Sequence, residues 1–488
     1  MRLHAPQGIE RRHLVVALVL APPIIASGCG GDTDTDVGAC ILPDVADRLP
    51  LQQDAYFKAA SGAGTKSTFG VPVALSADGR TLAVGARDDP SGALGVGADP
   101  TDRSKPGGGA VYVFVHDGVT WSQQAYLKPS SGSALVGFGG AVAISRTGDT
   151  LIVGIPEDSS SKLQPAGTSG GSVVIFRRMG TAWSEEAYLH SSRAAAGANF
   201  GTSVAISDNG DTAVVGAPDD AGRTAAPCEG EVRQLRSLPP CPGAVTVFVR
   251  AEKRWTEHMI LEPPTWVIEE TRAAAHVGVR VAVSGDGSVV AALAEAAVHT
   301  FAGGTSFAYE ATVRATPGAS DESWLRLAMA SDGRTLAIGE PGSDSVEVYS
   351  RLRGQLQRTA VVKPLASRPG AGFGGAVALS ASGTALAIGA FRDDGGTGGT
   401  NPNPCGPVVG VAGAAYLFTL DAGTWRERAF VKPRVVHENA YFGGSVALDD
   451  RGSIVAIGAG GDPSSATGID GDESDTSAPF SGAAYLFR

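Results

Sequence analysis

The sequence predicts an all-β protein, a seven-bladed β-propeller of four-stranded blades, from three observations. Glycine accounts for 67 of 488 residues and only 18% of residues are charged, a composition typical of many short strands joined by tight turns. An apolar hairpin block recurs along the chain, and an N-terminal strand supplies the one piece that the last repeat lacks. Because such repeats bury their apolar faces against their neighbours, we expect one continuous ring.

The first 28 residues have the pattern of an export signal. A basic start containing Arg2 precedes an apolar run, residues 14–25, that is too short to span a bilayer. The run ends in Ala-Ser-Gly-Cys at Cys29, which resembles the bacterial lipobox and predicts cleavage before Cys29 and its lipidation. An ordinary secretory signal with an incidental cysteine is the alternative, and both place the protein outside the cytoplasm. Gly30 is not the aspartate associated with inner-membrane retention, so we expect the outer membrane and leave the export route open.

The net charge of −11 excludes one class of partner. Removal of residues 1–28, which hold three arginines and one glutamate, makes the chain still more acidic. An acidic surface repels phosphate backbones, so we expect no nucleic-acid partner. Residues 29–50, rich in Asp, Gly and Thr, are predicted to be an acidic, flexible tether that joins the membrane anchor to the domain at 51–488.

Four cysteines remain after Cys29, and in an oxidising compartment they can pair in three ways. Cys228 and Cys241 lie in one long loop, so closing that loop costs little chain entropy and we favour this bond. Cys40 with Cys405 then follows by elimination alone. No two cysteines have the spacing of zinc ligands.

The hairpin block consists of two runs of Val, Ile, Leu and Ala around a turn that contains glycine. Both runs are apolar on both faces, as the inner strands of a blade must be when neighbouring blades cover them. Glycines that follow the first Phe and glycines that precede Ala are expected where blades approach closely. The seven copies begin at Phe69, Phe138, Phe200, Val277, Ser323, Phe373 and Phe442.

A third strand follows every hairpin, but a fourth strand follows only six of them, because the chain stops at Arg488. Fourth strands alternate polar and apolar residues, as the outer edge of a blade should. The missing copy is the segment LQQDAYFK that begins at Leu51. We therefore predict that this N-terminal strand completes the last blade and closes the ring.

Phe-Gly at the first strand, together with Gly-Ala-Pro at residues 216–218, resembles the FG-GAP signature of integrin α-subunits. The blades resemble those of bacterial integrin-α-like repeat proteins, many of which are lipoproteins, and the tail from Ser464 is similar to that family's recurrent blade. WD-repeat blades are also similar, but the Phe-Gly starts favour the FG-GAP family. The resemblance covers residues 51–488; it implies the fold and leaves the ligand open.

The candidate site is the face that carries the long connections between second and third strands. These begin near Arg87, Pro156, Pro218, Phe391 and Gly460, whereas those near Glu295 and Pro341 are very short and predict a notch over blades 4 and 5. The long loops carry pairs of acidic residues. Clustered carboxylates suit calcium, and Asp470, Asp472 and Asp475 are the candidate ligands, with a solvated polar loop as the alternative.

We found no signature of a catalytic site, and no catalytic residue is predicted. The leading hypothesis is a non-catalytic binding or adhesion module of the cell envelope whose ligand is a protein or a polysaccharide. One alternative is a propeller enzyme acting on glycans or peptides, which needs acidic or histidine side chains that converge at the axis. The other is a mainly structural envelope lipoprotein.

Overall fold

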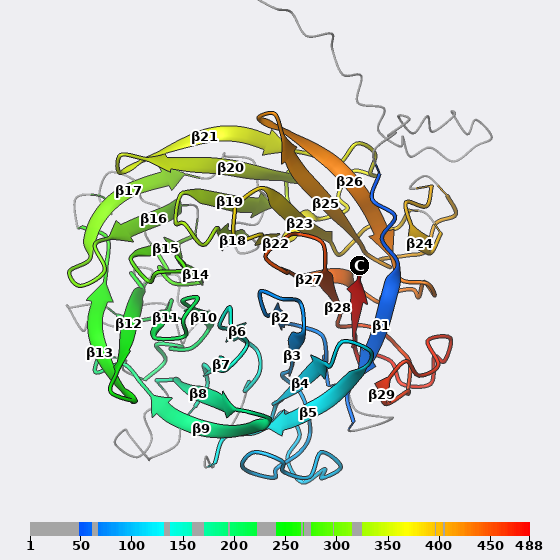
Figure 1. Cartoon of the computed structure of the whole chain (residues 1–488), viewed down its shortest axis with the longest axis horizontal. Coiled ribbons are helices and arrows are strands. Elements are labelled where there is room, and N and C mark those ends of the chain that lie inside the picture. Colours follow the sequence, from blue (N-terminus) through cyan, green and yellow to red (C-terminus); the bar gives the residue numbers. More distant parts are fainter. Residues whose placement is uncertain are drawn as a thin grey trace, which may run out of the picture.

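The computed structural model is a ring of seven antiparallel sheets arranged around a central axis, as predicted (Figure 1). The structure describes residues 48–60, 67–130, 137–158, 170–193, 196–221, 241–264, 267, 275–295, 297–314, 325–395, 397–403 and 406–488. Within these ranges no helix has the length and hydropathy needed to cross a bilayer.

The strands of the first four blades run from the axis outward in chain order. Blade 1 has β2 (Val73–Leu75), β3 (Thr81–Ala86), β4 (Ala110–His116) and β5 (Trp121–Leu127). Blade 2 has β6 (Val142–Ile144), β7 (Thr150–Ile155), β8 (Ser172–Met179) and β9 (Ala182–Leu189). Blade 3 has β10 (Ser203–Ile206), β11 (Thr212–Ala217), β12 (Ala244–Ala251) and β13 (Arg254–Leu261). Blade 4 has β14 (Arg280–Val283), β15 (Val289–Leu293), β16 (Ala297–Ala302) and β17 (Ala308–Arg314).

Blade 5 follows the same order, whereas blades 6 and 7 depart from it. Blade 5 has β18 (Arg326–Met329), β19 (Thr335–Glu340), β20 (Ser345–Leu352) and β21 (Gln355–Val362). Blade 6 has β22 (Phe373–Leu379), β23 (Ala385–Ala390), β25 (Ala414–Asp421), β26 (Thr424–Lys432) and the added β24 (Gly399–Thr400). Blade 7 has β27 (Phe442–Leu448), β28 (Val455–Ala459), β30 (Ala483–Phe487), β1 (Gln53–Lys58) and the added β29 (Gly468–Ile469). In blades 6 and 7 the order outward departs from chain order, because β24 lies outside β26 and because β1 and β29 lie outside β30. The sequence did not predict the short fifth strands β24 and β29.

Ring closure by the N-terminal strand is confirmed. Strand β1 pairs antiparallel with β30, with Tyr56 opposite Tyr485. The backbone amide of Gln52 donates to the Arg488 carbonyl at 2.8 Å, and the Arg488 amide donates to the Gln52 carbonyl at 3.0 Å. The first and last described strands therefore occupy one sheet, which leaves β30 with no open edge.

The apolar core lies between the blades. The first core cluster joins Phe57 of blade 7 to Phe69 and Phe114 of blade 1, and all three side chains are fully buried. The Phe57 and Phe114 ring centroids are 4.9 Å apart across this blade boundary. Every residue of β3 is buried, which explains why that strand is apolar on both of its faces.

The expected close approach of the blades at glycine is also present. A Cβ atom added to Gly85 of blade 1 would lie 2.2 Å from the carbonyl oxygen of Gly139 in blade 2. One added to Gly109 would lie 2.0 Å from the Phe138 carbonyl oxygen. Any larger side chain at these positions must push neighbouring blades apart. Blade 4 departs from the pattern, since Leu293 occupies the position of Gly85.

The first-hairpin turns are hydrogen-bonded to one another around the axis. The amide of Ala77 in blade 1 donates to Arg146 of blade 2 at 3.0 Å, and the Arg146 amide donates to Asp208 of blade 3 at 3.1 Å. The series continues through Gly285, Ser331 and Ala381, and Asp450 of blade 7 donates back to Ala77. The Arg146 guanidinium also forms ion pairs with Asp208 and Asp450. We call this set of turns the axial turn ring.

Candidate functional site

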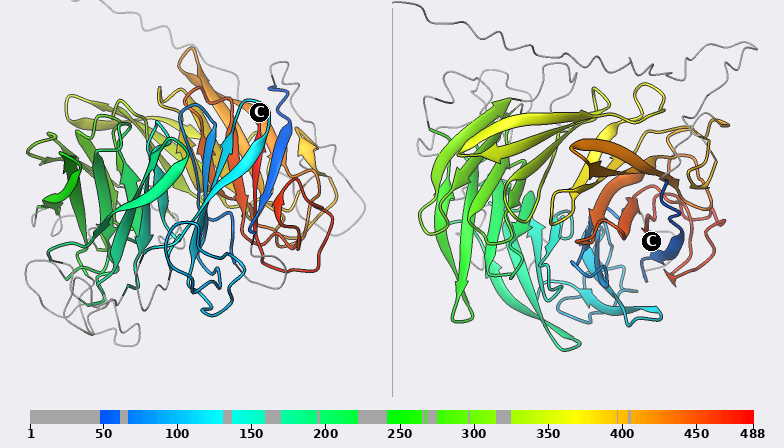
Figure 2. Two further views of the ribbon diagram at one scale, coloured as in Figure 1. Left: turned by 60° about the horizontal axis from the view of Figure 1, so that its bottom comes forward. Right: turned by 45° about the horizontal axis from the view of Figure 1, so that its top comes forward.

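The two faces of the propeller differ in the length of their connections. Tight turns join the first strand to the second and the third to the fourth, whereas the longer connections emerge on the opposite face (Figure 2). In blade 1, the connection runs from Ala86 to Ala110. In blade 4, β15 ends at Leu293 and β16 begins at Ala297. In blade 5, β19 ends at Glu340 and β20 begins at Ser345, so both connections are only a few residues long. The notch that the sequence predicts over these two blades is therefore present in the second-to-third strand connections.

The acidic pairs on the long loops are not uniformly available to a ligand. In blade 1, Asp88 is exposed but the adjacent Asp89 is fully buried. The same offset, three residues after the end of the second strand, places a buried aspartate in five blades. These aspartates are Asp89, Asp158, Asp220, Asp393 and Asp462. The interpretation of the acidic pairs as a solvated polar surface is wrong for these five residues, whose carboxylates are buried.

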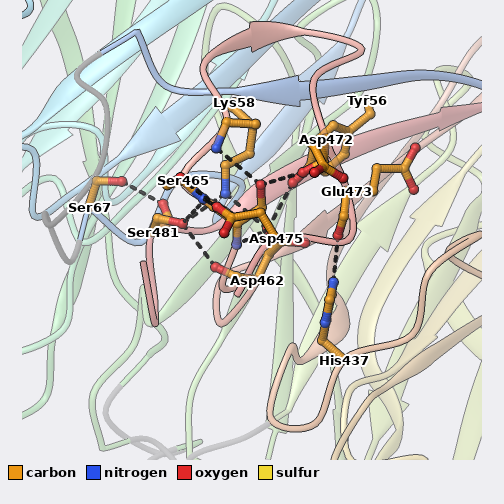
Figure 3. Close-up of polar contacts among 12 residues, drawn as sticks. Tyr56, Lys58, Ser67, His437, Asp462, Ser465, Asp472, Glu473, Asp475 and Ser481 are labelled. Carbon is orange, nitrogen blue, oxygen red and sulfur yellow. Dashed lines mark hydrogen bonds and ion pairs between the residues drawn. The ribbon is translucent and has the colours of Figure 1, made fainter. Parts of the chain in front are cut away.

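Asp462 shows what the buried carboxylate does (Figure 3). It accepts hydrogen bonds from Tyr56 Oη at 2.9 Å, from Tyr485 Oη at 2.7 Å and from Lys58 Nζ at 2.9 Å. Burial lowers the pKa of Lys58, and the Asp462 charge acts in the opposite direction. Burial also raises the pKa of Tyr485. Asp462 thus accepts hydrogen bonds from three donors on two strands and joins the loop base to β1.

Blades 1 and 6 repeat this arrangement. Asp89 accepts from Tyr112 and Tyr126, each at 2.9 Å, and Asp393 pairs with Lys432 at 2.8 Å. In blade 1, Lys128 donates to backbone carbonyls instead, and burial lowers its pKa to about 8. The sequence signal was a lysine at the end of the fourth strand combined with a constant offset of the aspartate. Read separately, these residues suggest only a solvated surface.

The proposed calcium ligands lie on the exposed part of the blade 7 loop, and each is engaged locally. Asp470 Oδ1 accepts the Tyr56 amide at 2.9 Å, Asp472 accepts from a neighbouring serine, and Asp475 Oδ2 accepts the Ser465 amide at 2.6 Å. Hydrogen bonds from serines lower the pKa of Asp472 and of Asp475, so both are ionised. Over the described part of the chain, no three His, Cys, Asp or Glu side chains are grouped to hold a metal. Calcium binding by these three aspartates stays a prediction.

A concave site of about 280 Å³ lies beside this loop. His437 and Glu438 line one side, and Gly461 and Phe480 line the other. The His437 ring Nε2 lies 2.6 Å from the Glu473 carbonyl oxygen, which joins the β26–β27 connection to the blade 7 loop. Phe480 is 39% exposed, a large fraction for an aromatic side chain. An apolar surface with polar groups at its margin can bind a ligand without performing chemistry on it.

At the blade 3 side of the notch, His276 contacts two carboxylates. Its Nδ1 lies 2.9 Å from Asp219 and its Nε2 lies 3.6 Å from Glu295. The hydrogen bond to Asp219 raises the pKa of His276, with burial opposing it. This group ties the connection between blades 3 and 4 to the loop that follows β11.

Four of the sequence-predicted site residues, Cys29, Cys40, Cys228 and Cys405, lie outside the described residues. Cys241 is buried and disulfide-bonded. Its partner lies outside the described residues, so the pairing of Cys228 with Cys241 and of Cys40 with Cys405 stays a prediction.

Fold and loops together define a β-propeller that exposes one irregular face. The family model for the FG-GAP repeat matches residues 121–176 and 183–231. Each match begins at a fourth strand and continues into the next blade, so the chain carries FG-GAP repeats. No curated protein matches this chain.

Solved structures resemble it in fold. The β-propeller domain of Myceliophteria thermophila Cps50 (Swd1) is 10% identical with a TM-score of 0.50, over 90% of this chain and 99% of that one. Pseudomonas aeruginosa periplasmic gluconolactonase, PpgL, is 13% identical with a TM-score of 0.44, over 80% and 98%. Chaetomium thermophilum Sqt1, bound to the N-terminus of ribosomal protein L10, is 12% identical with a TM-score of 0.44, over 84% and 86%. At these identities the likeness concerns the fold alone.

Proposed function

We propose that this chain is a non-catalytic binding or adhesion module that presents its long-loop face to a protein or a polysaccharide outside the cell. We further propose that a lipid on Cys29 anchors it in the envelope, in the outer membrane, through the tether 29–50. The observation that carries the proposal is the arrangement of the loops: long connections gather on one face, and buried aspartates fix their bases. Loops that a rigid scaffold positions are common sites of recognition.

The binding part is tested by retention of partners on the immobilised mature chain, residues 29–488 with Cys29→Ser. Cell-envelope fractions and purified extracellular polysaccharides are passed over it at low and high salt. We expect a retained partner, and weaker retention by Phe480→Ser on the long-loop face. Met179→Ser is the matched control, because Met179 is 77% exposed on a tight turn of the opposite face.

Two results would contradict this assignment. Retention of nothing under any ionic condition would remove the binding function. Loss of retention in Met179→Ser, with Phe480→Ser unaffected, would move the site to the tight-turn face.

The anchor is tested separately in cells. We expect the wild-type protein to partition into detergent with a lipid-modified Cys29, and Cys29→Ala to be released in soluble form. If the Cys29→Ala protein still partitioned into the detergent phase, another segment would hold it to the membrane.

A further inference from the structure

One position of the inner strand differs between the blades in its charge. This is the third residue after the Phe of Phe-Gly or its equivalent. In chain order the seven residues are Pro72, Ala141, Ser203, Arg280, Arg326, Ala376 and Ser445. Five blades have a small or cyclic neutral residue there, and the adjacent blades 4 and 5 each have an arginine. These are the same two blades whose second-to-third strand connections are shortest.

The serines at this position show where it lies. Ser203 Oγ donates to the Gly278 carbonyl of the next blade at 2.7 Å, and Ser445 Oγ donates to the Gly70 carbonyl at 2.7 Å. The position therefore lies at the junction between neighbouring inner strands. It is at the start of those strands, the end that the long connections approach, and the axial turn ring lies at the other end.

Both arginines keep part of their surface accessible at this place. Each residue as a whole is of intermediate exposure, while its guanidinium group is largely buried. Arg280 Nη1 donates to the Val279 carbonyl at 2.6 Å, and Arg326 Nη1 donates to the Leu325 carbonyl at 3.1 Å. Among the described residues, no carboxylate forms an ion pair with Arg280. The rest of β14 and β18 consists of Val, Ala, Leu and Met.

The two arginines occupy the same position of adjacent inner strands, and β14 packs against β18. Burial lowers the pKa of both guanidinium groups, and the charge of Arg280 is a further cause of the lowered pKa of Arg326. Two like charges close together in a partly desolvated place are unfavourable, and an anion between them relieves both the repulsion and the lost hydration. The planar fork of a guanidinium suits the paired oxygens of a carboxylate, sulfate or phosphate.

We propose that Arg280 and Arg326 form an oxyanion site at the axial end of the notch, which binds a carboxylate, sulfate or phosphate group of the ligand. This proposal deepens the proposed binding function, since it names the charged chemistry of what the long-loop face accepts. The two cations lie away from the acidic loops of blades 1, 6 and 7, and the carboxylates nearest to them in the fold are Glu295 and Glu340 of blades 4 and 5.

The test measures anion binding directly by calorimetry and by the melting temperature of the full mature chain. Sodium sulfate, phosphate and glucuronate are compared with sodium chloride at equal ionic strength. We expect at least one oxyanion to raise the melting temperature, and Arg280→Gln and Arg326→Gln each to weaken its binding about tenfold or more, as loss of a charge-assisted hydrogen bond does. Arg353→Gln, which changes an exposed arginine on a tight turn of blade 5, should bind like the wild type.

Further variants cover the case in which a substitution disturbs folding. Arg280→Lys keeps the charge but loses the fork, so it should fold and bind sulfate more weakly. Without any oxyanion, Arg280→Gln should melt no lower than the wild type, because it removes a like charge. Equal oxyanion effects in the wild type and in the Arg280→Gln, Arg326→Gln double variant would overturn the site, and so would the absence of any effect in the wild type.

The double variant also separates this proposal from the proposed function. If the wild-type chain retains a partner and the double variant retains it equally, the oxyanion site is not where the ligand binds, although the binding module stands. If sulfate binds through the two arginines but no partner is retained, the site stands and the proposed function fails.

Discussion

Blades 1, 6 and 7 differ from blades 4 and 5 at one buried cross-strand position. In the first group, the third strand has a tyrosine there, and in blades 1 and 7 it faces another tyrosine on the fourth strand. In blade 4 the same pair is His299 and Thr312, joined at 2.7 Å, and in blade 5 the third strand has Glu347. Of these five blades, only blades 1, 6 and 7 have the tyrosine together with a buried aspartate at the loop base and a buried lysine at the end of the fourth strand.

The difference follows the length of the loops. Each aspartate of the first group accepts the amide of the residue two positions later, as Asp462 does from Ser464 at 3.1 Å and Asp89 from Ser91 at 3.0 Å. Such a bond turns the chain at the point where it leaves the second strand. A short connection needs no such base, and blades 4 and 5 lack it. The buried network therefore serves to hold the long loops, and the propeller fold itself forms without it in blades 4 and 5.

The largest expected effect comes from removing the base of the blade 7 loop. Asp462→Ala would leave the buried Lys58 charge without its counter-ion and with Ser481 as its hydrogen-bond acceptor, and it would remove the Asp462 acceptor from two buried tyrosine hydroxyls. We expect a loss of about 3–5 kcal/mol in the free energy of unfolding, measured by urea denaturation. Asp472→Ala, on the exposed part of the same loop, is the control and should cost less than about 1 kcal/mol. Equal losses in the two variants would mean that the buried network does not support the blade.

A smaller effect is expected in blade 4, where the buried His299 makes the free energy of unfolding depend on pH. Burial lowers the pKa of His299 to about 4, whereas an unfolded histidine titrates near 6.5. As the pH falls from about 6.5 to about 4, the unfolded chain takes up a proton that folded His299 does not. Stability is therefore present above the unfolded pKa and is lost on acidification, by up to about 3 kcal/mol.

The measurement is the difference between urea denaturation curves of the wild type and of His299→Gln at several pH values. Glutamine can bond to Thr312 but does not titrate, so the variant should lose less stability over this range. His190→Gln controls for the removal of a histidine elsewhere. Parallel pH profiles for wild type and His299→Gln would contradict the prediction.

The smallest expected effect concerns calcium on the blade 7 loop. Because Asp470, Asp472 and Asp475 already accept local hydrogen bonds, a bound ion has to compete with those donors. We expect millimolar calcium to raise the melting temperature of residues 29–488 by about 1–2 °C over chelator, as a weak extracellular site would. The rise should disappear in Asp472→Asn, Asp475→Asn. A rise that survives in this variant would place the ion elsewhere, and no rise in the wild type would leave the loop as solvated surface.

The sequence was sufficient for the architecture because the architecture depends on local, repeated signals. Apolar hairpin runs, glycine turns, alternating fourth strands and the displaced strand at Leu51 are each visible in a short window, and the ring follows from the number of repeats. Strands β24 and β29 were missed because each pairs through only two residues and has no alternation. The buried aspartates were misread because composition treats a carboxylate as solvated.

The candidate site was less predictable for a related reason. The long-loop face and its notch follow from loop lengths, and both were anticipated. To predict that Arg280 and Arg326 are neighbours, one has to know that these residues, 46 positions apart in the chain, occupy the same position of the inner strand in adjacent blades. Alignment of the repeats is needed to recognise this equivalence. Because the position holds a neutral residue in five blades, no short stretch of sequence marks it as a binding position.

The closure of blade 7 also has a mechanical consequence. Strand β1 leads out of the proposed tether, and its Tyr56 and Lys58 are bonded to Asp462 at the base of the loop that carries Phe480. If the envelope holds one end and a ligand pulls on that loop, tension passes from the loop through Asp462 into β1 and on to the membrane. Leu49 and Leu51, which precede β1, are also bonded to Arg428 and Thr400 of blade 6, and Phe57 of β1 packs on Phe114 of blade 1. Blades 2 to 5 lie outside this line of force. Load borne by blade 7 and its two neighbours leaves the far side of the ring unstrained, so the loops of blades 2 to 5 can keep their shape while the molecule is under pull.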